Sequence, residues 1–240
     1  MQYMRSVQFI MDRANWLTNI LLGGVCLIIP IIGPIAMHGY MFEVIDALHN
    51  DPEHKEYPDF DFNRFMDYLT RGIWSFLMSL VIGLIIGVPL GIFCGCLMAV
   101  GIGIASSTKS PAVMLVFQLL MFLLAIAVIF LALLVSWPAT LQAGLKREFD
   151  FPGMIQFVKD FNKLVIKEML LSALFVFLVG IFALVVGGLT CGIGLMFTGA
   201  AASMAAYHIL FQLYELYLER GGTPVEPKPI RESGREDRLD

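Results

Sequence analysis

Residues 112–137 read AVMLVFQLLMFLLAIAVIFLALLVSW, a run that contains no charged side chain. An α-helix needs about 20 predominantly apolar residues to cross the hydrocarbon core of a bilayer. Trp137 ends the run and Pro138 follows it. Tryptophan favours the membrane interface, and proline disfavours helix in the residue before it. Residues 112–137 therefore predict a transmembrane helix that ends at Trp137.

Three further apolar runs are long enough to cross a membrane, namely residues 17–37, 73–105 and 169–214. The last run would measure about 69 Å as one helix, more than twice the bilayer core. We therefore expect two spans in it, 169–188 and 193–214. The glycine-rich segment 187–194 is the predicted turn, because glycine adopts the positive φ values that reversing a chain requires.

These runs predict a single integral membrane domain, residues 1–219, of the all-α polytopic class. About four transmembrane helices form two hairpins, 73–105 with 112–137 and 169–188 with 193–214. The run 73–105 would be about 50 Å long, so it must tilt, kink or protrude. Pro89 near its centre predicts a kink.

The first apolar run, 17–37, is interrupted by Pro30, Gly33 and Pro34. Prolines so close together rarely permit one straight helix. We expect two half-helices that either re-enter the membrane from one side or span it. Arg5 and Arg13 favour a cytoplasmic N-terminus, which requires the re-entrant form.

Two connecting segments, 59–72 and 146–168, combine apolar residues at helical spacing with charged ones. This pattern predicts amphipathic helices that lie in the membrane interface. Phe60-Asp61-Phe62 recurs 89 residues later as Phe149-Asp150-Phe151, and other short matches keep that offset. An internal repeat of one interfacial helix and one hairpin is the interpretation.

Basic residues favour the cytoplasmic side of a bacterial membrane. With two hairpins, thirteen Lys and Arg residues lie on the side of the two interfacial helices and the C-terminus, and only Lys109 lies opposite. We therefore expect a multi-pass protein of the cell (inner or cytoplasmic) membrane. The tail, 220–240, is rich in charge, Gly and Pro and is predicted to be cytoplasmic and disordered.

The composition, 58% hydrophobic and 15% charged, departs from that of soluble domains. The net charge of −4 and the scattered basic residues exclude a nucleic-acid surface. The four cysteines have no ligand-type spacing, and we interpret them as reduced packing residues: Cys26, Cys94, Cys96 and Cys191. The acidic segment 41–72 lacks a fixed metal-ligand spacing. No cofactor and no metal is expected.

Several short motifs occur in a recognisable order in the first 75 residues: Asp12-Arg13-Ala14-Asn15-Trp16-Leu17, Pro30-Ile31-Ile32-Gly33, Gly39-Tyr40, Tyr57-Pro58-Asp59-Phe60-Asp61 and Gly72. In this order the chain resembles a family of bacterial and archaeal multi-pass membrane proteins known as domain of unknown function 4013. Beyond these residues only the hydrophobic pattern is similar. The resemblance implies a prokaryotic membrane protein and supplies no catalytic residue.

The strongest local pattern is a series of small residues four apart, whose glycines are Gly83, Gly87, Gly91, Gly95 and Gly103. Such a glycine zipper forms a groove along a helix and lets another helix approach closely. We interpret the series as a helix-packing face, within the chain or between subunits. A backbone-lined conduit is the alternative.

Charged residues are absent from 73–108, 110–145 and 169–212. Proton-coupled transport and charged substrates usually need such groups inside the membrane, so both lose weight. His38 and His208, each near the end of an apolar run, are interpreted as interfacial polar residues that form hydrogen bonds. A pH-responsive contact between the two histidines is the alternative.

The sequence contains no catalytic constellation, so we expect a protein that is not an enzyme. The favoured function is a helix-packing scaffold or an assembly component whose partners are the lipid bilayer and a second copy or another membrane protein. One alternative is a permease or channel for a neutral or apolar small solute, with the broken first run lining the path. The other is a membrane-embedded lipid-modifying enzyme.

Overall fold

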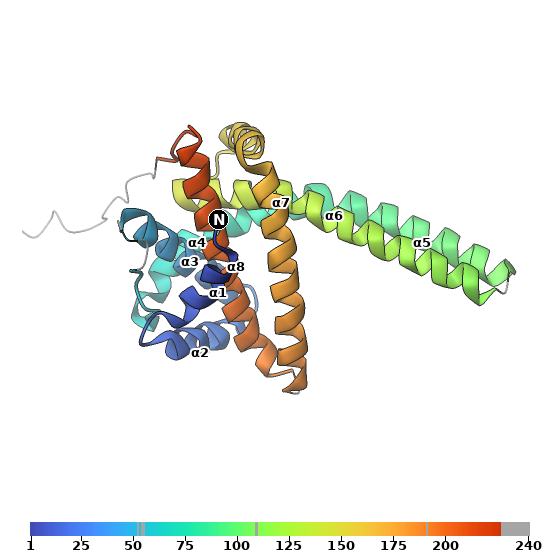
Figure 1. Ribbon diagram of the computed structural model, residues 1–240, viewed down its shortest axis with the longest axis horizontal. Coiled ribbons are helices and arrows are strands. Elements are labelled where there is room, and N and C mark those ends of the chain that lie inside the picture. The colour runs from blue at the N-terminus through green and yellow to red at the C-terminus, as the bar shows by residue number, and fades with distance from the viewer. Residues whose placement is uncertain (52, 54–55, 109, 191, 227–240) are drawn as a thin grey trace, which may run out of the picture.

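The structure, a computed structural model, describes residues 1–51, 53, 56–108, 110–190 and 192–226. Every regular element within these residues is helical, which confirms the all-α class (Figure 1). In chain order the elements are α1 (Tyr3–Gln8), the 3₁₀ turn η1 (Phe9–Met11), α2 (Trp16–Leu27), α3 (Ile32–Asn50), the 3₁₀ turn η2 (Phe62–Arg64), α4 (Phe65–Ile82), the π-helical turn η3 (Gly83–Gly87), α5 (Val88–Thr108), α6 (Pro111–Lys146), α7 (Phe151–Leu189) and α8 (Gly194–Glu219).

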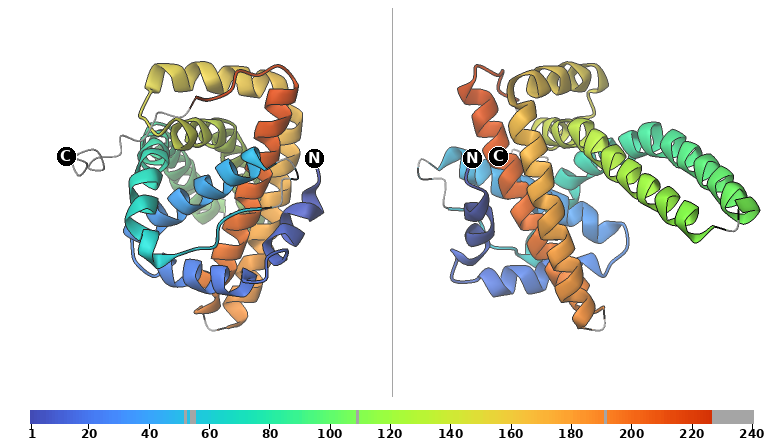
Figure 2. Two further views of the ribbon diagram at one scale, coloured as in Figure 1. Left: turned by 90° about the vertical axis from the view of Figure 1, so that its left-hand side faces the viewer. Right: turned by 45° about the vertical axis from the view of Figure 1, so that its right-hand side comes forward.

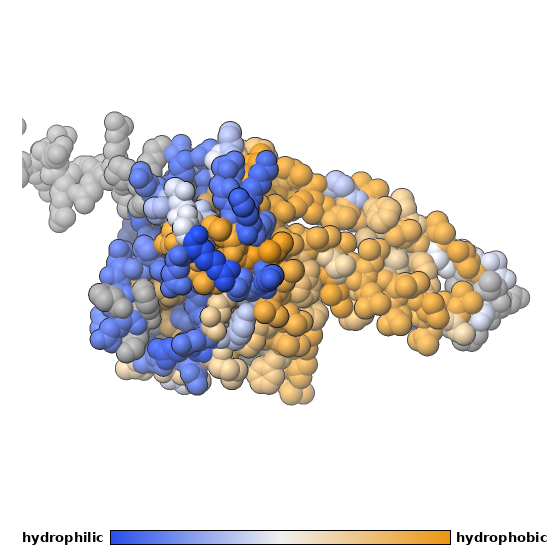
Figure 3. Space-filling view, turned by 45° about the horizontal axis from the view of Figure 1, so that its top comes forward, coloured by the Kyte–Doolittle hydropathy of each residue, from blue (hydrophilic) through white to orange (hydrophobic). Residues whose placement is uncertain are grey.

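The chain forms a body with two hairpins. The first hairpin, α5 with α6, projects away from the body, and the second, α7 with α8, packs against it (Figures 1 and 2). Polar side chains gather on the body and apolar ones cover the projecting hairpin (Figure 3). Four helical runs among the described residues are long and apolar enough to cross a membrane, namely Phe62–Ile104, Ala112–Lys146, Phe151–Leu189 and Gly194–Glu219.

The turn of the second hairpin lies where the sequence predicts it. α7 ends at Leu189 and α8 begins at Gly194, and Gly192 between them has φ of 85°. A residue with a Cβ rarely adopts this conformation, so glycine at this position permits the chain to reverse. Cys191 lies outside the described residues.

Pro89 does not end its helix. A single π-helical turn, η3, stands directly before α5 and widens the backbone. Proline at position 89 has no N–H to donate to the carbonyl of Ile85 and would crowd it in an ordinary α-turn. The π-turn accommodates the ring, so the run from Phe62 to Ile104 continues through it.

Pro138 likewise does not end α6, contrary to the prediction that the helix stops at Trp137. α6 continues to Lys146 with Pro138 inside it. The carbonyl of Leu134 loses its helical donor at this proline. The side-chain amide of Asn162 on α7 donates to that carbonyl over 2.9 Å and replaces the missing hydrogen bond.

The first apolar run is broken at Pro30, as predicted. α2 ends at Leu27 and α3 begins at Ile32, and α2 with 12 residues is too short to cross a bilayer. Ile31 has φ of 66° and ψ of −58°, and the amide of Ile32 donates to the carbonyl of Pro30 over 2.7 Å. This is a classic γ-turn, which is strained for a β-branched residue.

Gly33 and Pro34 lie in the first turn of α3 rather than in the break. Proline is tolerated there because the first N–H groups of a helix have no helical partner. Gly33 is a close-contact residue, since a Cβ on it would lie 1.9 Å from the carbonyl oxygen of Cys26. The two half-helices are therefore packed tightly against each other at the break.

α3 and α4 cross at two glycines. A Cβ on Gly39 would lie 1.8 Å from the carbonyl oxygen of Tyr68, and one on Gly72 would lie 1.9 Å from that of Ile35. Glycine on each helix, because it has no side chain, allows the two helix backbones to approach this closely. Tyr40 and Tyr68, next to these contacts in sequence, are fully buried and lie with their ring centres 5.6 Å apart.

The two predicted interfacial segments are the first parts of longer helices. Residues 62–72 run through η2 into α4, and residues 151–164 form the start of α7, which bends at the non-helical Val165 (Figure 2). Asp61 caps the first run by accepting from the amide of Asn63, and Asp150 caps the second by accepting from that of Gly153. Both Phe-Asp-Phe motifs thus begin a helix, while the repeat itself stays a prediction.

The first residues of the predicted disordered tail contact the body instead. The amide of Thr223 donates to the Tyr217 hydroxyl, and the amide of Val225 donates to the Tyr214 hydroxyl, each over 3.0 Å. The side chain of Val225 also packs against the main apolar core. The remainder of the predicted tail, 227–240, lies outside the described residues.

Candidate functional site

Three of the five motifs that carry the family resemblance, at residues 12–17, 39–40 and 57–61, meet in one cluster. Asp59, in the loop between α3 and α4, accepts from the side-chain amide of Asn15 over 2.8 Å and from that of Asn19 over 3.0 Å. Asn19 is buried, and its own carbonyl oxygen accepts from the amide of Phe60 over 3.0 Å. The two hydrogen bonds hold the pKa of the Asp59 carboxyl below its usual value.

Tyr57 anchors the same loop to the N-terminal segment. Its hydroxyl donates to the carbonyl of Phe9 over 3.5 Å, and the guanidinium of Arg13 lies 5.4 Å from the centre of its ring. Burial raises the pKa of Tyr57 to about 12, so its hydroxyl stays protonated and remains a donor.

Aromatic rings hold the other side of the loop. Phe60 lies between Tyr40 of α3 and Tyr68 of α4, with ring centres 5.1 and 5.2 Å away. The Tyr40 hydroxyl donates to the carbonyl of Pro58 over 3.2 Å, and the Tyr68 hydroxyl accepts from the amide of Asp61 over 3.3 Å. We call residues 57–61 with these partners the 57–61 clamp.

The 57–61 clamp links α2, α3 and α4. Both oxygens of Asp59 and the amide oxygen of Asn19 are engaged within it. Satisfied polar networks fix one arrangement of a structure. The clamp is therefore a structural joint, and the residues that carry the resemblance build the body of the protein.

A second polar layer was not predicted from the sequence. Asp46 of α3 accepts from Arg71 of α4 and, over 3.3 Å, from Arg147 after α6. One turn earlier on α3, Glu43 pairs with Arg64 through both carboxylate oxygens. The partners are up to 101 residues apart in sequence, so no local pattern indicates the layer.

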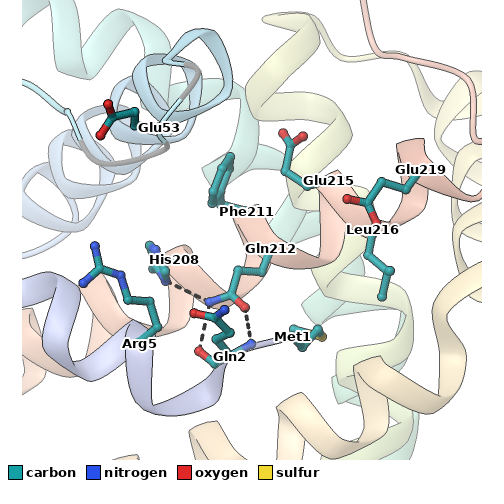
Figure 4. Close-up of a pocket in the computed structure, with 10 residues that line it drawn as sticks. All are labelled: Met1, Gln2, Arg5, Glu53, His208, Phe211, Gln212, Glu215, Leu216 and Glu219. Atoms are coloured by element: carbon teal, nitrogen blue, oxygen red, sulfur yellow. Dashed lines mark hydrogen bonds between the residues drawn. The ribbon is translucent and has the colours of Figure 1, made fainter.

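A polar pocket of about 540 Å³ lies between α1 and the C-terminal half of α8 (Figure 4). Gln212 closes its floor, accepting from the amide of Gln2 over 2.7 Å and donating to the Ser6 hydroxyl over 3.0 Å. Arg5 at its edge is paired with Asp12 over 2.8 Å. The floor contacts join the N-terminal helix to α8.

The two predicted interfacial histidines have separate partners. His38 of α3 contacts the hydroxyl of Tyr207 through its Nδ1 atom. His208 is buried, its Nδ1 lies 2.9 Å from the Ser6 hydroxyl, and its ring stacks on Phe9 with centres 4.3 Å apart. Both histidines thus join α8 to other helices by hydrogen bonds.

The predicted glycine zipper faces away from the rest of the chain. At Gly83, Gly87, Gly91, Gly95 and Gly103 an added Cβ would meet no described atom within 4 Å. Gly101 is different, because a Cβ there would lie 1.9 Å from the ring of Phe117 on α6. α5 therefore packs against α6 through Gly101, whereas the zipper glycines of η3 and α5 have open space where a Cβ would lie.

No group of three or more His, Cys, Asp and Glu side chains that could hold a metal ion occurs among the described residues. His54 of the acidic segment lies outside them. Cys26, Cys94 and Cys96 are free thiols, and only Cys26 is fully buried.

The protein combines a body with polar side chains on its surface and four helical runs that are long and apolar enough to cross a membrane. This combination defines a polytopic helical membrane protein. The model of a family described as protein of unknown function (DUF4013) matches residues 22–192, well over half of the chain. The chain belongs to this family. No curated protein and no solved structure gave a match.

The family match reaches further than the sequence motifs suggest. It extends through the first hairpin and α7 to residue 192, beyond the first 75 residues that carry the short motifs, and it ends before α8. The motif at residues 12–17 precedes the matched region. Three of the four long apolar runs therefore lie within the region that the family model describes.

Proposed function

We propose that this protein is a non-enzymatic membrane component that assembles with a second copy or with another membrane protein through the glycine zipper of η3 and α5. The proposal rests on the open space that an added Cβ would meet at Gly87, Gly91 and Gly95. In lipid, helices associate by van der Waals contact, and small residues four apart allow the closest approach.

The surroundings of the zipper support a role between molecules. Beyond its base the hairpin projects from the body, so α5 has α6 as its neighbour there (Figure 1). Large apolar side chains such as Ile92 and Phe93 flank the glycines and are more than half exposed. A partner helix would find a backbone groove with apolar walls.

The polar clusters of the body support the non-enzymatic part of the proposal. In the 57–61 clamp the carboxylate oxygens of Asp59 are hydrogen-bonded, and in the second layer Asp46 and Glu43 are paired with arginines. Catalysis needs a base or nucleophile that can reach a substrate. These groups instead neutralise and position one another.

The packing of the first apolar run opposes the permease alternative. A conduit along this run would need space at the break, yet Cys26, Gly33, Ala36 and Met37 are buried there. The contact of Gly33 with the Cys26 carbonyl closes the gap between the half-helices. No cavity is therefore expected between α2 and α3.

Cross-linking in lipid nanodiscs or native membranes tests the assembly proposal. Replacing Gly87 and Gly91 by Leu should abolish cross-linked dimers or partner adducts, because the added side chains fill the groove. Gly180→Leu is the matched control, since Gly180 on α7 also has open space around it. Thermal unfolding of each variant separates lost assembly from lost folding. Association that is unchanged in the well-folded double variant would refute the proposal.

A further inference from the structure

An apolar groove of about 260 Å³ lies where the two hairpins leave the body. Its walls are Ile82, Ile85 and Ile86 of α4 and η3, Val135 of α6, and Ile155 and Val158 of α7. All four elements belong to three helical runs that are long enough to cross a membrane. The groove therefore opens on the part of the surface that lipid chains reach.

The π-turn and the bend in α7 shape this groove. Ile85 and Ile86 lie within η3, the turn that accommodates Pro89. Ile155 and Val158 lie on the part of α7 that precedes the bend at Val165. The first arm of α7 thus lies across the base of the projecting hairpin instead of alongside it (Figure 2).

One positive charge lines this otherwise apolar groove, the ammonium group of Lys159. Lys163 and Lys167 follow at intervals of four residues, and all three lysines are exposed. Among the described residues no carboxylate lies within ion-pair distance of these three side chains. Of the three, Lys159 lines the groove itself, so its charge faces any anion that lies there.

We propose that this groove binds one acyl chain of an anionic phospholipid, with the lipid phosphate at Lys159. A bilayer is as apolar as the groove, so the acyl chain gains shape-matched contact there rather than burial from water. The choice of headgroup comes from the lysines, because basic residues at the interface attract anionic lipids. The groove lies apart from the zipper glycines, so the proposal stands independently of the assembly function.

The first test uses the unmodified full chain in nanodiscs that contain phosphatidylglycerol with a photoreactive acyl chain. Cross-links are expected in the peptides that contain residues 82–86, 135 and 151–158. The same label on phosphatidylcholine should react less at these peptides. Cross-links spread evenly over the exposed hairpin, or equal labelling by both lipids, would overturn the proposal.

Variants separate the roles of the groove and the charge. Lys159→Gln should lower the preference for phosphatidylglycerol at these peptides about fivefold. Lys167→Gln, beyond the bend, is the charge control and should change it much less. Ile86→Trp should fill the groove and remove the cross-links, whereas Leu123→Trp on the exposed surface of α6 should retain them. Equal effects of the two lysine variants, or of the two tryptophan variants, would also overturn the proposal.

Discussion

Replacing Gly72 by Ala tests the crossing of α3 and α4. The new Cβ would lie 1.9 Å from the carbonyl oxygen of Ile35 and 2.7 Å from the amide nitrogen of Gly39. Real Cβ atoms essentially never approach another atom to less than 3.0 Å, so the two helices must separate by about an ångström. Both obstructing atoms belong to the backbone, and no change of rotamer relieves the contact.

The expected loss follows from two opposing effects. Overpacking a well-packed site typically costs about 1–3 kcal/mol, and more where the backbone itself must move. Alanine in place of glycine recovers about 1 kcal/mol of helix propensity. We therefore expect Gly72→Ala to lower the free energy of unfolding by about 2 kcal/mol. Gly39→Ala should cost a similar amount, because its Cβ would lie 1.8 Å from the Tyr68 carbonyl.

Reversible denaturation of the full chain in mixed micelles measures these free energies. Gly180→Ala serves as the control, since a Cβ at Gly180 meets no described atom within 4 Å. The double variant of Gly39 and Gly72 should lose less than the sum of the single losses, because one separation of the helices relieves both contacts. Single variants as stable as the control would refute the close crossing.

Three further predictions concern other joints of the body. Asn162→Leu should destabilise the protein by about 1–3 kcal/mol, because it leaves the Leu134 carbonyl without a hydrogen-bond donor. The loss should be smaller in a Pro138→Ala background, where the backbone N–H of residue 138 can donate to that carbonyl. Equal losses in both backgrounds, measured by chemical denaturation, would contradict this explanation. The pKa of Asp59 in the folded protein lies below its usual 3.8, so its contribution to the free energy of unfolding is present above pH 3.8 and is lost as the pH falls through the folded-state pKa. Asp59→Asn should therefore flatten the pH dependence of the free energy of unfolding below pH 3.8. An unaltered pH profile would count against the 57–61 clamp. Ile31→Gly should raise the thermal midpoint by relieving the strained γ-turn, partly offset by the greater freedom of glycine in the unfolded chain, and a lower midpoint would contradict the strain.

The arrangement of the spans could be predicted from length and composition alone. A run that is more than twice as long as the bilayer core is thick must reverse, and its glycine-rich segment 187–194 indicates where. The break at Pro30 was predictable for the same local reason, because proline removes a helical hydrogen bond. These features depend on neighbouring residues, which a single sequence displays.

Features that depend on distant partners could not be predicted in this way. Pro138 is a helix-ending signal by itself, and only Asn162 on another helix explains why α6 continues. Gly39 and Gly72 are single glycines without a repeat, so nothing in their spacing distinguishes a crossing point. The zipper on η3 and α5 has the stronger pattern, yet a Cβ added at any of its glycines would meet no described atom of a neighbouring helix within 4 Å.

The two kinds of glycine therefore divide the protein into an internal and an external part. Gly39 and Gly72 pack inside the body, where α3 and α4 cross. The 57–61 clamp, which holds Asp59 and its asparagine partners, lies in the same body. The family motifs of the first 75 residues thus account for how the body is built. The zipper glycines instead leave open space on their side of the hairpin, which is the feature on which the proposed assembly depends. We therefore expect protein partners to bind on the hairpin surface and lipid to bind in the groove at its base, which Lys159 lines.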